Sequence, residues 1–186
     1  DTAPGSLRGF YLQEPDYRTD NNPLTSEAVF VYAEGTDLQV QVGDLLRVEG
    51  TVAEYFEETQ IIALTQWANC GTNQLSSVSA SSITLPFNDF IELESKEGML
   101  VTTATDLTVS DVFNAVRFGE VTLSNGRLFT PTQLVLPGEA ARQLSAANAR
   151  NRLLLENGRT GTFRQPFIIG EDGVTEVSAT NPIRNG

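Results

Sequence analysis

Histidine is absent from the 186-residue sequence. Its absence excludes Ser-His-Asp and Cys-His catalysis and every metal site that uses a His ligand. Cysteine occurs once, as Cys70, so no disulfide bond can form within the chain. Two interpretations of Cys70 stay open: a small buried apolar residue, which is the more common case, or a residue whose partner lies outside this segment.

Basic residues and long apolar runs are also scarce. No apolar run approaches the roughly 20 residues that span a bilayer, and the opening residues, Asp1 to Gly5, do not resemble a signal peptide, which fits a mature or excised segment. The 24 acidic residues outnumber the 12 basic ones, giving a net charge of −12 and a pI of about 4.3. This charge repels phosphate polymers, so nucleic acid would have to bind locally or through calcium or magnesium. An acidic surface that serves only solubility is the alternative.

One alternating stretch, Val42 to Tyr55, organises the fold. Gly43-Asp44 is a turn signal, and Gly50 interrupts the strand that follows, as Gly does at a bulge or a sharp barrel bend. The alternation places three apolar residues on one side of this strand and three polar residues on the other: Leu46, Val48 and Val52 against Arg47, Glu49 and Thr51. Such a stretch is typical of a small, strongly coiled antiparallel barrel of the OB-fold type.

The patterns along the chain predict an all-β protein. We expect a five-stranded OB-fold-type antiparallel barrel over residues 7–75, a Ser/Ala-rich linker over 76–82, and a second β-rich subdomain over 83–158 with one short helix near 139–148. Residues 159–186 form a weakly patterned C-terminal segment. Asn125-Gly126 predicts a type I′ hairpin between residues 119–124 and 127–129. Further strands are expected at residues 9–13, 28–32, 59–65, 98–102, 107–109 and 151–155.

Ordered fragments that cover most of residues 9 to 158 resemble one family. They include Gly9-Phe10-Tyr11-Leu12-Gln13, Thr25 to Tyr32, Val42-Gly43-Asp44, Arg47 to Tyr55, Glu97 to Val101, Arg117-Phe118-Gly119-Glu120, Arg127 to Gln133, Pro137-Gly138 and Arg152 to Leu155. In this order the fragments resemble secreted bacterial nucleases of the ExeM/NucH type. The resemblance implies an OB-fold domain ahead of a C-terminal endonuclease/exonuclease/phosphatase-type catalytic domain, and an extracellular or cell-surface location.

The sequence departs from this family in two places. The family's first barrel strand would precede Gly9, where only Asp1 to Arg8 remains, so we expect a barrel that is incomplete or closed by another segment. The family's Asp-Asp-Gly after the strand at Leu155 is Glu156-Asn157-Gly158 here. Nothing resembles the catalytic half, which needs His. The resemblance therefore implies a non-catalytic accessory module that presents DNA or RNA to a separate metal-dependent domain; the alternative is a structural or protein-interaction scaffold module.

Six residues are candidates for nucleic-acid binding: Tyr11, Tyr32, Arg47, Tyr55, Arg117 and Arg127. The first four are candidates for the outer face of the barrel, where aromatic rings stack on bases and Arg groups meet phosphates. Alternation makes Tyr11 and Arg47 face away from their apolar neighbours. Arg117 and Arg127, with Arg150 and Arg152, form the densest basic set outside it. The alternative is structural: tyrosines that cap the core and arginines that pair with carboxylates. Glu92 and Glu94, expected on one face of a strand, are weak candidates for acid/base catalysis.

Overall fold

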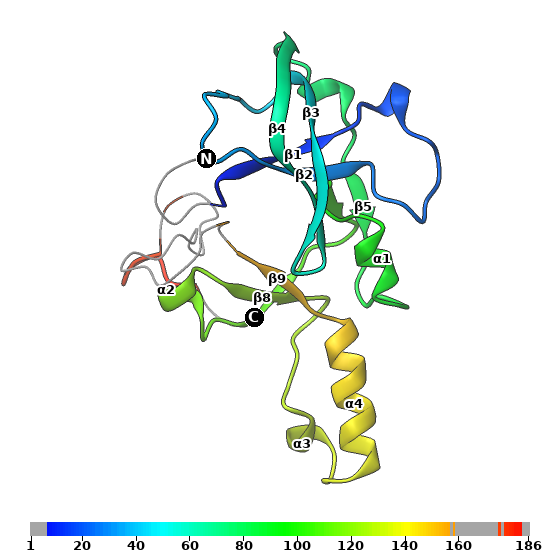
Figure 1. Ribbon diagram of the computed structural model, residues 1–186. Helices are drawn as coiled ribbons and strands as arrows, with labels where there is room; N and C mark the ends of the chain where they lie inside the picture. The colour runs from blue at the N-terminus through cyan, green and yellow to red at the C-terminus, as the bar shows by residue number, and fades with distance from the viewer. Residues whose placement is uncertain (1–6, 157, 159–174, 176, 184–186) are drawn as a thin grey trace. The chain divides into compact units, whose positions relative to one another are not determined.

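The computed structural model describes residues 7–156, 158, 175 and 177–183 (Figure 1). The described chain is mostly β-sheet with a few short helices, which confirms the β-rich class. It divides into two compact units, the first comprising Asp1–Ser82 and Ile91–Thr102, the second Ile83–Phe90 and Thr103–Gly186. This division differs from the expected one, because residues 91–102 return to the first unit. Most of the predicted C-terminal segment, residues 159–186, lies outside the described residues.

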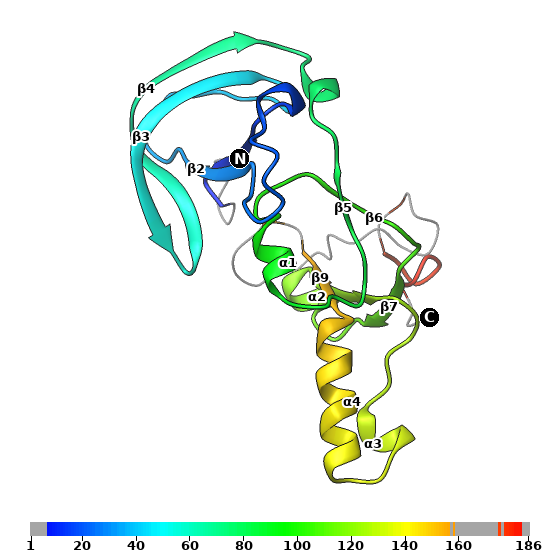
Figure 2. The same ribbon diagram turned by 90° about the vertical axis from the view of Figure 1, so that its right-hand side faces the viewer.

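The first unit contains a four-stranded sheet. Its strands are β1 (Gly9–Gln13), β2 (Ala28–Tyr32), β3 (Leu45–Tyr55) and β4 (Glu58–Gly71), in the order β1-β2-β4-β3. The β1–β2 and β3–β4 pairs are antiparallel, whereas β2 and β4 run parallel. Figure 2 shows β3 and β4 as a long, strongly curved ribbon. Among the described residues no strand joins the outer edges of β1 and β3, so the expected five-stranded barrel is not closed.

The core of the first unit centres on β2. Phe30 and Val31 are buried, and the Tyr11 ring packs edge-on against Phe30 with 5.1 Å between the ring centroids. Gly9 allows this close packing, because a Cβ atom there would lie 2.3 Å from the Val31 carbonyl oxygen and 2.4 Å from Phe30 Cζ. The five residues that the sequence predicts as this strand are the residues that form it, since β-branched and aromatic side chains suit a strand buried on both faces.

Gly50 lies at an irregularity in the β3–β4 pairing, as the sequence predicts. The register shifts between Glu49 and Thr51, and Ala63 on β4 takes a left-handed backbone with φ of 49°. A Cβ atom at Gly50 would lie 2.7 Å from the Ile62 carbonyl oxygen. The irregularity also changes which side chains face inward. Val52, predicted on the apolar side, is therefore 69% exposed, because strict alternation does not continue across a bulge.

The predicted linker, residues 76–82, contains regular structure. It begins within the short 3-10 helix Leu75–Ser77 and enters β5 (Ser81–Ile83), which pairs with β6 (Val101–Thr103). Ser79 is held by Asp16, whose carboxylate accepts hydrogen bonds from the Ser79 N–H at 2.9 Å and the Ser79 hydroxyl at 2.6 Å. These local hydrogen bonds order a stretch whose composition alone is typical of a flexible linker.

The Asp16–Ser79 contact makes the stability of the first unit depend on pH. The Ser79 hydroxyl and N–H donate to the carboxylate and hold the pKa of Asp16 below its ordinary value of 3.8. The stabilisation is therefore complete above the unfolded-state pKa and is lost as the pH falls through the lower folded-state pKa. Asp16→Asn is expected to be less stable than the parent at pH 7, with the gap closing toward pH of about 3. Urea unfolding followed by Trp67 fluorescence measures the free energy of unfolding of the parent and the variant at both pH values. A difference between them that is equal at both pH values contradicts a stabilising role for the Asp16 carboxylate.

The second unit contains a three-stranded sheet and most of the helical residues. Strands β7 (Thr108–Asp111), β8 (Val121–Ser124) and β9 (Leu153–Leu155) are antiparallel in the order β7-β8-β9. The helices are α2 (Ala115–Phe118), α3 (Pro131–Leu134) and α4 (Glu139–Arg150), with α1 (Ile91–Glu94) in the first unit. Helix α4 confirms the predicted helix. No helix among the described residues is long and apolar enough to cross a bilayer.

The predicted Asn125-Gly126 hairpin is wrong. Strand β8 pairs with β7 and with β9, and residues 127–129 form no strand. Asn125 instead exchanges two hydrogen bonds with Asn151: the Asn125 N–H donates to Oδ1 at 3.1 Å, and Asn151 Nδ2 donates to the Asn125 carbonyl at 2.9 Å. Asn125 Nδ2 also donates to the Leu85 carbonyl. These long-range bonds bring the segment after α4 to β8 in place of the local partner.

The prediction that places Glu92 and Glu94 on one face of a strand is wrong. Both residues lie in helix α1, so the pairing that suggested acid/base catalysis is absent. This error arises where a short polar-apolar pattern fits more than one kind of secondary structure. Of the two interpretations left open for Cys70, the buried one is excluded, because Cys70 is exposed on β4.

Candidate functional site

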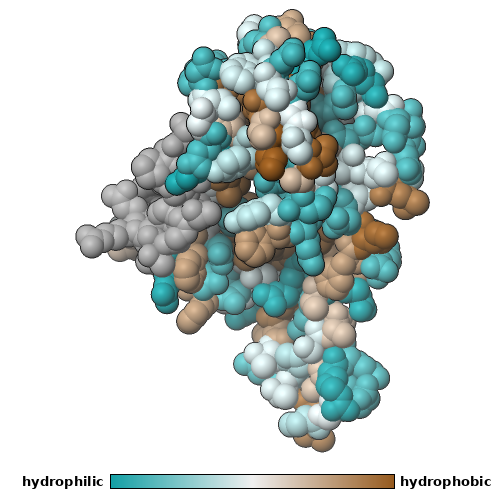
Figure 3. Space-filling model, in the orientation of Figure 1, coloured by the Kyte–Doolittle hydropathy of each residue, from teal (hydrophilic) through white to brown (hydrophobic). Residues whose placement is uncertain are grey.

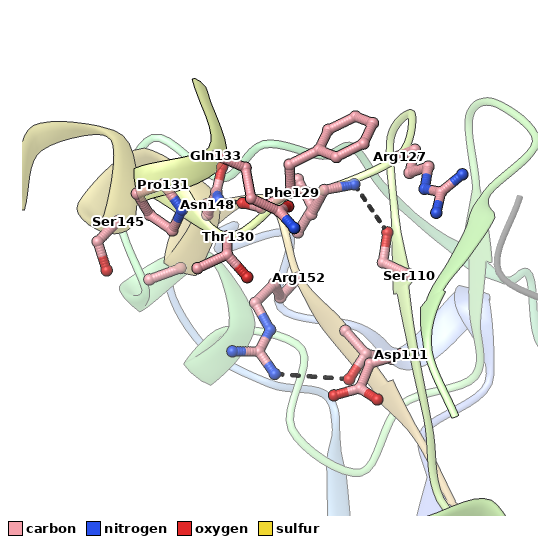
Figure 4. A pocket seen from close by; sticks show the side chains of 13 residues that line it. Ser110, Asp111, Arg127, Phe129, Thr130, Pro131, Gln133, Ser145, Asn148 and Arg152 are labelled. Carbon is pink, nitrogen blue, oxygen red and sulfur yellow. Dashed lines mark hydrogen bonds between the residues drawn. The ribbon is translucent and has the colours of Figure 1, made fainter. Parts of the chain in front are cut away.

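A hollow of about 510 Å³ lies in the second unit, between the β7–β8–β9 sheet and the α3–α4 pair (Figure 4). Its walls come from β7, β8, the segment before α3, α3, the last turns of α4 and the residue before β9. The lining residues are Ser110, Asp111, Thr122, Arg127, Leu128, Phe129, Thr130, Pro131, Gln133, Ser145, Asn148, Ala149 and Arg152. Polar side chains dominate this set, so the hollow suits a polar ligand.

Side-chain hydrogen bonds fix the wall of the hollow to the sheet. The Leu128 N–H donates to the Ser110 hydroxyl at 3.1 Å, and the Ser124 hydroxyl donates to the Gly126 carbonyl at 2.8 Å. The Ser110 and Ser124 hydroxyls are themselves hydrogen bonded, and Ser124 is fully buried. From the other side, Asn148 Nδ2 of α4 donates to the Phe129 carbonyl at 3.0 Å. The segment that carries Arg127 is thus held at both ends by rigid elements.

Two arginines without an ion pair line the hollow. Arg8, Arg18 and Arg142 pair with Glu34, Glu14 and Glu139, whereas Arg127 and Arg152 form no ion pair among the described residues. Arg152 reaches toward Thr122, to whose Oγ1 it donates one long hydrogen bond of 3.5 Å (Figure 4). A guanidinium has five N–H donors, so most of those on Arg152 remain available.

The hollow is locally cationic. Asp111 is the one carboxylate in the lining, and it already accepts a hydrogen bond of 2.8 Å from the Phe113 N–H. Arg127 lies over the Phe129 ring, 5.1 Å from its centroid, and Phe129 is 42% exposed. Guanidinium groups bind phosphate and carboxylate oxygens, and an exposed ring beside them offers a stacking surface. The arrangement therefore fits an anion that carries a flat or apolar group.

Two of the predicted site residues have structural roles. The Tyr11 hydroxyl donates to Glu58 at 2.8 Å while its ring packs on Phe30. The Tyr32 hydroxyl donates to Glu34, and this hydrogen bond raises the pKa of Tyr32. Both tyrosine hydroxyls therefore have a carboxylate partner within the chain, whereas the structural alternative predicts that these tyrosines cap the core.

Of the other predicted residues outside the hollow, two lie on β3 and one lies on α2. Arg47 is exposed on β3, and Tyr55, 63% exposed, ends the same strand. Arg117, on α2, lies over its neighbour Phe118 at 4.9 Å from the ring centroid. Of the six candidates only Arg127 lines the hollow, where it is joined by Arg152.

The sequence interpretation missed three polar residues of this hollow: Arg152, Gln133 and Asn148. Arg152 belonged to the basic set outside the barrel but was not among the six candidates. The register Thr122↔Leu154 brings it beside β8. A sequence signal for the other two is lacking, since amides near helix ends are common and seldom bind ligands.

Binding through calcium or magnesium is one of the alternatives that the sequence leaves open. In the part of the chain that the structure describes, no group of three or more Asp, Glu or Cys side chains is arranged to hold a metal. In the polar loop after β1, Asp20 Oδ1 accepts the Asn22 N–H at 2.7 Å and Glu27 accepts the Asp20 N–H at 3.1 Å. The carboxylates of Asp20 and Glu27 thus accept hydrogen bonds from N–H groups of this loop.

A crowded group of carboxylates lies in the first unit. Burial, followed by the negative charges of Glu94, Glu58 and Glu54, raises the pKa of Glu97 above its ordinary value of 4.5. A raised folded-state pKa means that the ionised form opposes folding at neutral pH, and that this opposition disappears as the pH falls through that pKa.

Glu97→Gln is therefore expected to stabilise the first unit at pH 7, because it removes one of these charges while keeping a hydrogen-bond acceptor. At pH below about 4 the variant and the parent should unfold together. Thermal unfolding followed by Trp67 fluorescence, at both pH values, measures the difference. A variant that is less stable than the parent at pH 7 contradicts this account.

Comparison of the chain with protein-family models, with curated proteins and with solved structures found no match. The likeness to secreted nucleases consequently rests on the sequence fragments alone. Function has to be inferred from the residues and from the site that they build.

Proposed function

We propose that this chain is a non-catalytic, nucleic-acid-handling accessory module of a secreted nuclease, which presents DNA or RNA to a separate metal-dependent endonuclease/exonuclease/phosphatase-type domain outside the cell. Arg127 and Arg152 both line the hollow and have no carboxylate partner among the described residues, and this observation carries the proposal. In a chain of net charge −12, two such arginines form a local site for an anion.

The first unit supports an OB-type fold for this module. The order β1-β2-β4-β3, with the parallel β2–β4 contact and the irregularity at Gly50, gives a curved sheet whose outer strands are β1 and β3. One further strand between these two edges would close a five-stranded barrel of the kind that binds oligonucleotides. The fragments that resemble the nuclease family include β1, β2 and most of β3.

Binding at the hollow would be local. Arg127 and Arg152 would each contact a phosphate, Phe129 would stack on a base, and the Gln133 and Asn148 amides would donate to sugar or base oxygens. Two phosphate contacts on a single strand give a slope of log affinity against log salt of about −1.4. The wider negative charge slows association but does not prevent this contact.

Fluorescence anisotropy of labelled single- and double-stranded oligonucleotides, over a salt series with and without magnesium or calcium, tests the proposal. We expect binding without a divalent cation and a shallow salt dependence, since only two arginines contribute. Binding only in the presence of the cation would show that a metal ion, and not the two arginines, connects the phosphates to the chain. No change in anisotropy under any of these conditions would contradict the proposal and favour the structural or protein-interaction scaffold.

A further inference from the structure

The β3–β4 hairpin ends in an exposed aromatic pair. We define the hairpin tip as residues 54–58, which join the two strands. Within it Phe56 is 88% exposed and Tyr55 is 63% exposed, and their rings meet edge-on with 4.6 Å between the centroids. Figure 3 shows apolar (brown) groups among hydrophilic (teal) ones on the face that carries β3 and β4. Neither ring of the tip contributes to the core.

The backbone of the hairpin tip is not one that these residues prefer. Phe56 and Glu57 both adopt left-handed angles, with φ of 50° and 68°. Two-residue hairpin turns with positive φ favour Asn and Gly, because a bulky side chain is hindered in that region. Phe56 thus weakens the turn that it occupies and gains nothing from burial. A residue that opposes local stability while remaining exposed points to a role in binding.

Three carboxylate residues lie next to the two aromatic residues in the sequence. Glu54, Glu57 and Glu58 all belong to the tip; Glu54 accepts a hydrogen bond from Thr59 and Glu58 accepts one from Gln60, so both are oriented by their neighbours. Burial is the main cause that raises the pKa of Glu97, and the negative charges of Glu94, Glu58 and Glu54 raise it further. The tip itself contains no basic residue. It is aromatic and strongly acidic at the same point.

We propose that the hairpin tip is a docking site for a cationic, Arg- or Lys-rich segment of a protein partner. Charge complementarity selects this occupant: a guanidinium or ammonium group binds the face of a Tyr or Phe ring and pairs with a nearby carboxylate at the same time. The same three carboxylates repel phosphates, so nucleic acid is a poorer occupant of the tip than of the arginine-lined hollow. The site is independent of the function proposed above.

A fluorescein-labelled peptide of repeating Arg-Gly units, titrated with the full chain at about 0.15 M ionic strength, probes the tip. Tyr55→Ala combined with Phe56→Ala is expected to weaken binding by about tenfold, and Glu57→Gln by about threefold. Matched controls are Phe113→Ala and Tyr17→Ala, which remove rings that are 88% and 73% exposed elsewhere. These controls should leave binding of the peptide unchanged.

A second variant separates binding from folding. Phe56→Asn with Glu57→Gly places the preferred Asn-Gly pair in the turn, so the melting temperature should rise by a few degrees while binding of the peptide falls. Loss of binding in a more stable protein has no explanation in unfolding.

The competing results are distinct. Equal weakening by the tip variants and by Glu49→Gln on β3 would show diffuse charge attraction and overturn the proposal. Reduced oligonucleotide binding with unchanged peptide binding would assign the tip to nucleic acid. A change in sedimentation of the chain alone, lost in the tip variants, would assign it to self-association. Either of the last two results also overturns the proposal.

Discussion

Replacing both Arg127 and Arg152 by Ala is expected to lower the affinity for a short single-stranded oligonucleotide by about 100-fold at low salt. In the proposed complex each arginine would make a charge-assisted contact that contributes about 1.4 kcal/mol, or roughly tenfold in affinity. The salt dependence should almost disappear, because no basic residue would remain in the hollow. Anisotropy titrations at several salt concentrations measure both effects.

The matched control is Arg18→Ala combined with Arg142→Ala. It removes the same two positive charges from the chain, but these arginines pair with Glu14 and Glu139 and do not line the hollow. We expect a change below about threefold, since exposed ion pairs contribute little and the net charge acts weakly across salt. A control as damaging as the hollow variant would show that total charge, and not this site, governs binding.

The second large effect is expected at Gly9. Gly9→Ala should destabilise the first unit by about 3 kcal/mol, because the new Cβ atom would lie 2.3 Å from the Val31 carbonyl oxygen and meet the Phe30 ring. Backbone cannot move aside as a flexible side chain does, and β1 pairs with β2 along its whole length. Urea unfolding reports this through Trp67, the one tryptophan, which lies on β4 of the same unit.

Two other glycines distinguish a clash from backbone strain. At Gly71 an added Cβ would meet only ordinary contacts of 3.9 and 4.0 Å, so Gly71→Ala should change stability by less than about 0.5 kcal/mol. Gly35 has open space but a φ of 79°, so Gly35→Ala should cost about 1 kcal/mol through its left-handed backbone. If Gly9→Ala behaves like either of these, the close approach of β1 to β2 is not as described.

The sequence predicted correctly those strands and helices whose secondary structure is determined by their own local side-chain pattern. The strand Ala28–Tyr32, the helix at Glu139–Arg150 and the strand Leu153–Leu155 follow from β-branched runs, an Ala-rich stretch after Pro-Gly, and an apolar run. The bulge at Gly50 was also predicted, but its effect on Val52 was not. Which side of the sheet Val52 faces depends on how β3 pairs with β4 across the bulge. The sequence of β3 alone does not contain that information.

Long-range contacts account for the errors. The Asn125-Gly126 hairpin fails because Asn151, from the far side of α4, takes the hydrogen bonds that a local partner would have made. The division of the chain was also expected at one linker, whereas residues 91–102 rejoin the first unit. No local sequence pattern predicts that residues 91–102 pack with the first unit.

The candidate site was predictable only in part. Arg127 was selected because it belonged to a basic set within a family-like fragment, and the structure gives it a second arginine. Tyr11 and Tyr32 followed the outer-face pattern, but Glu58 and Glu34 accept hydrogen bonds from their hydroxyls. In so acidic a chain, exposure on a strand does not tell whether a polar side chain already has a carboxylate partner.

The arginine side-chain N–H signals in a two-dimensional NMR spectrum test the central claim most directly. Titration with a short single-stranded oligonucleotide should shift the Nε–H signals of Arg127 and Arg152, with smaller changes at the ion-paired Arg18 and Arg142. Assignment by single Arg→Lys variants identifies each signal. If Arg47 or Arg117 shifts while both arginines of the hollow stay in place, nucleic acid binds elsewhere and the site proposed here is contradicted.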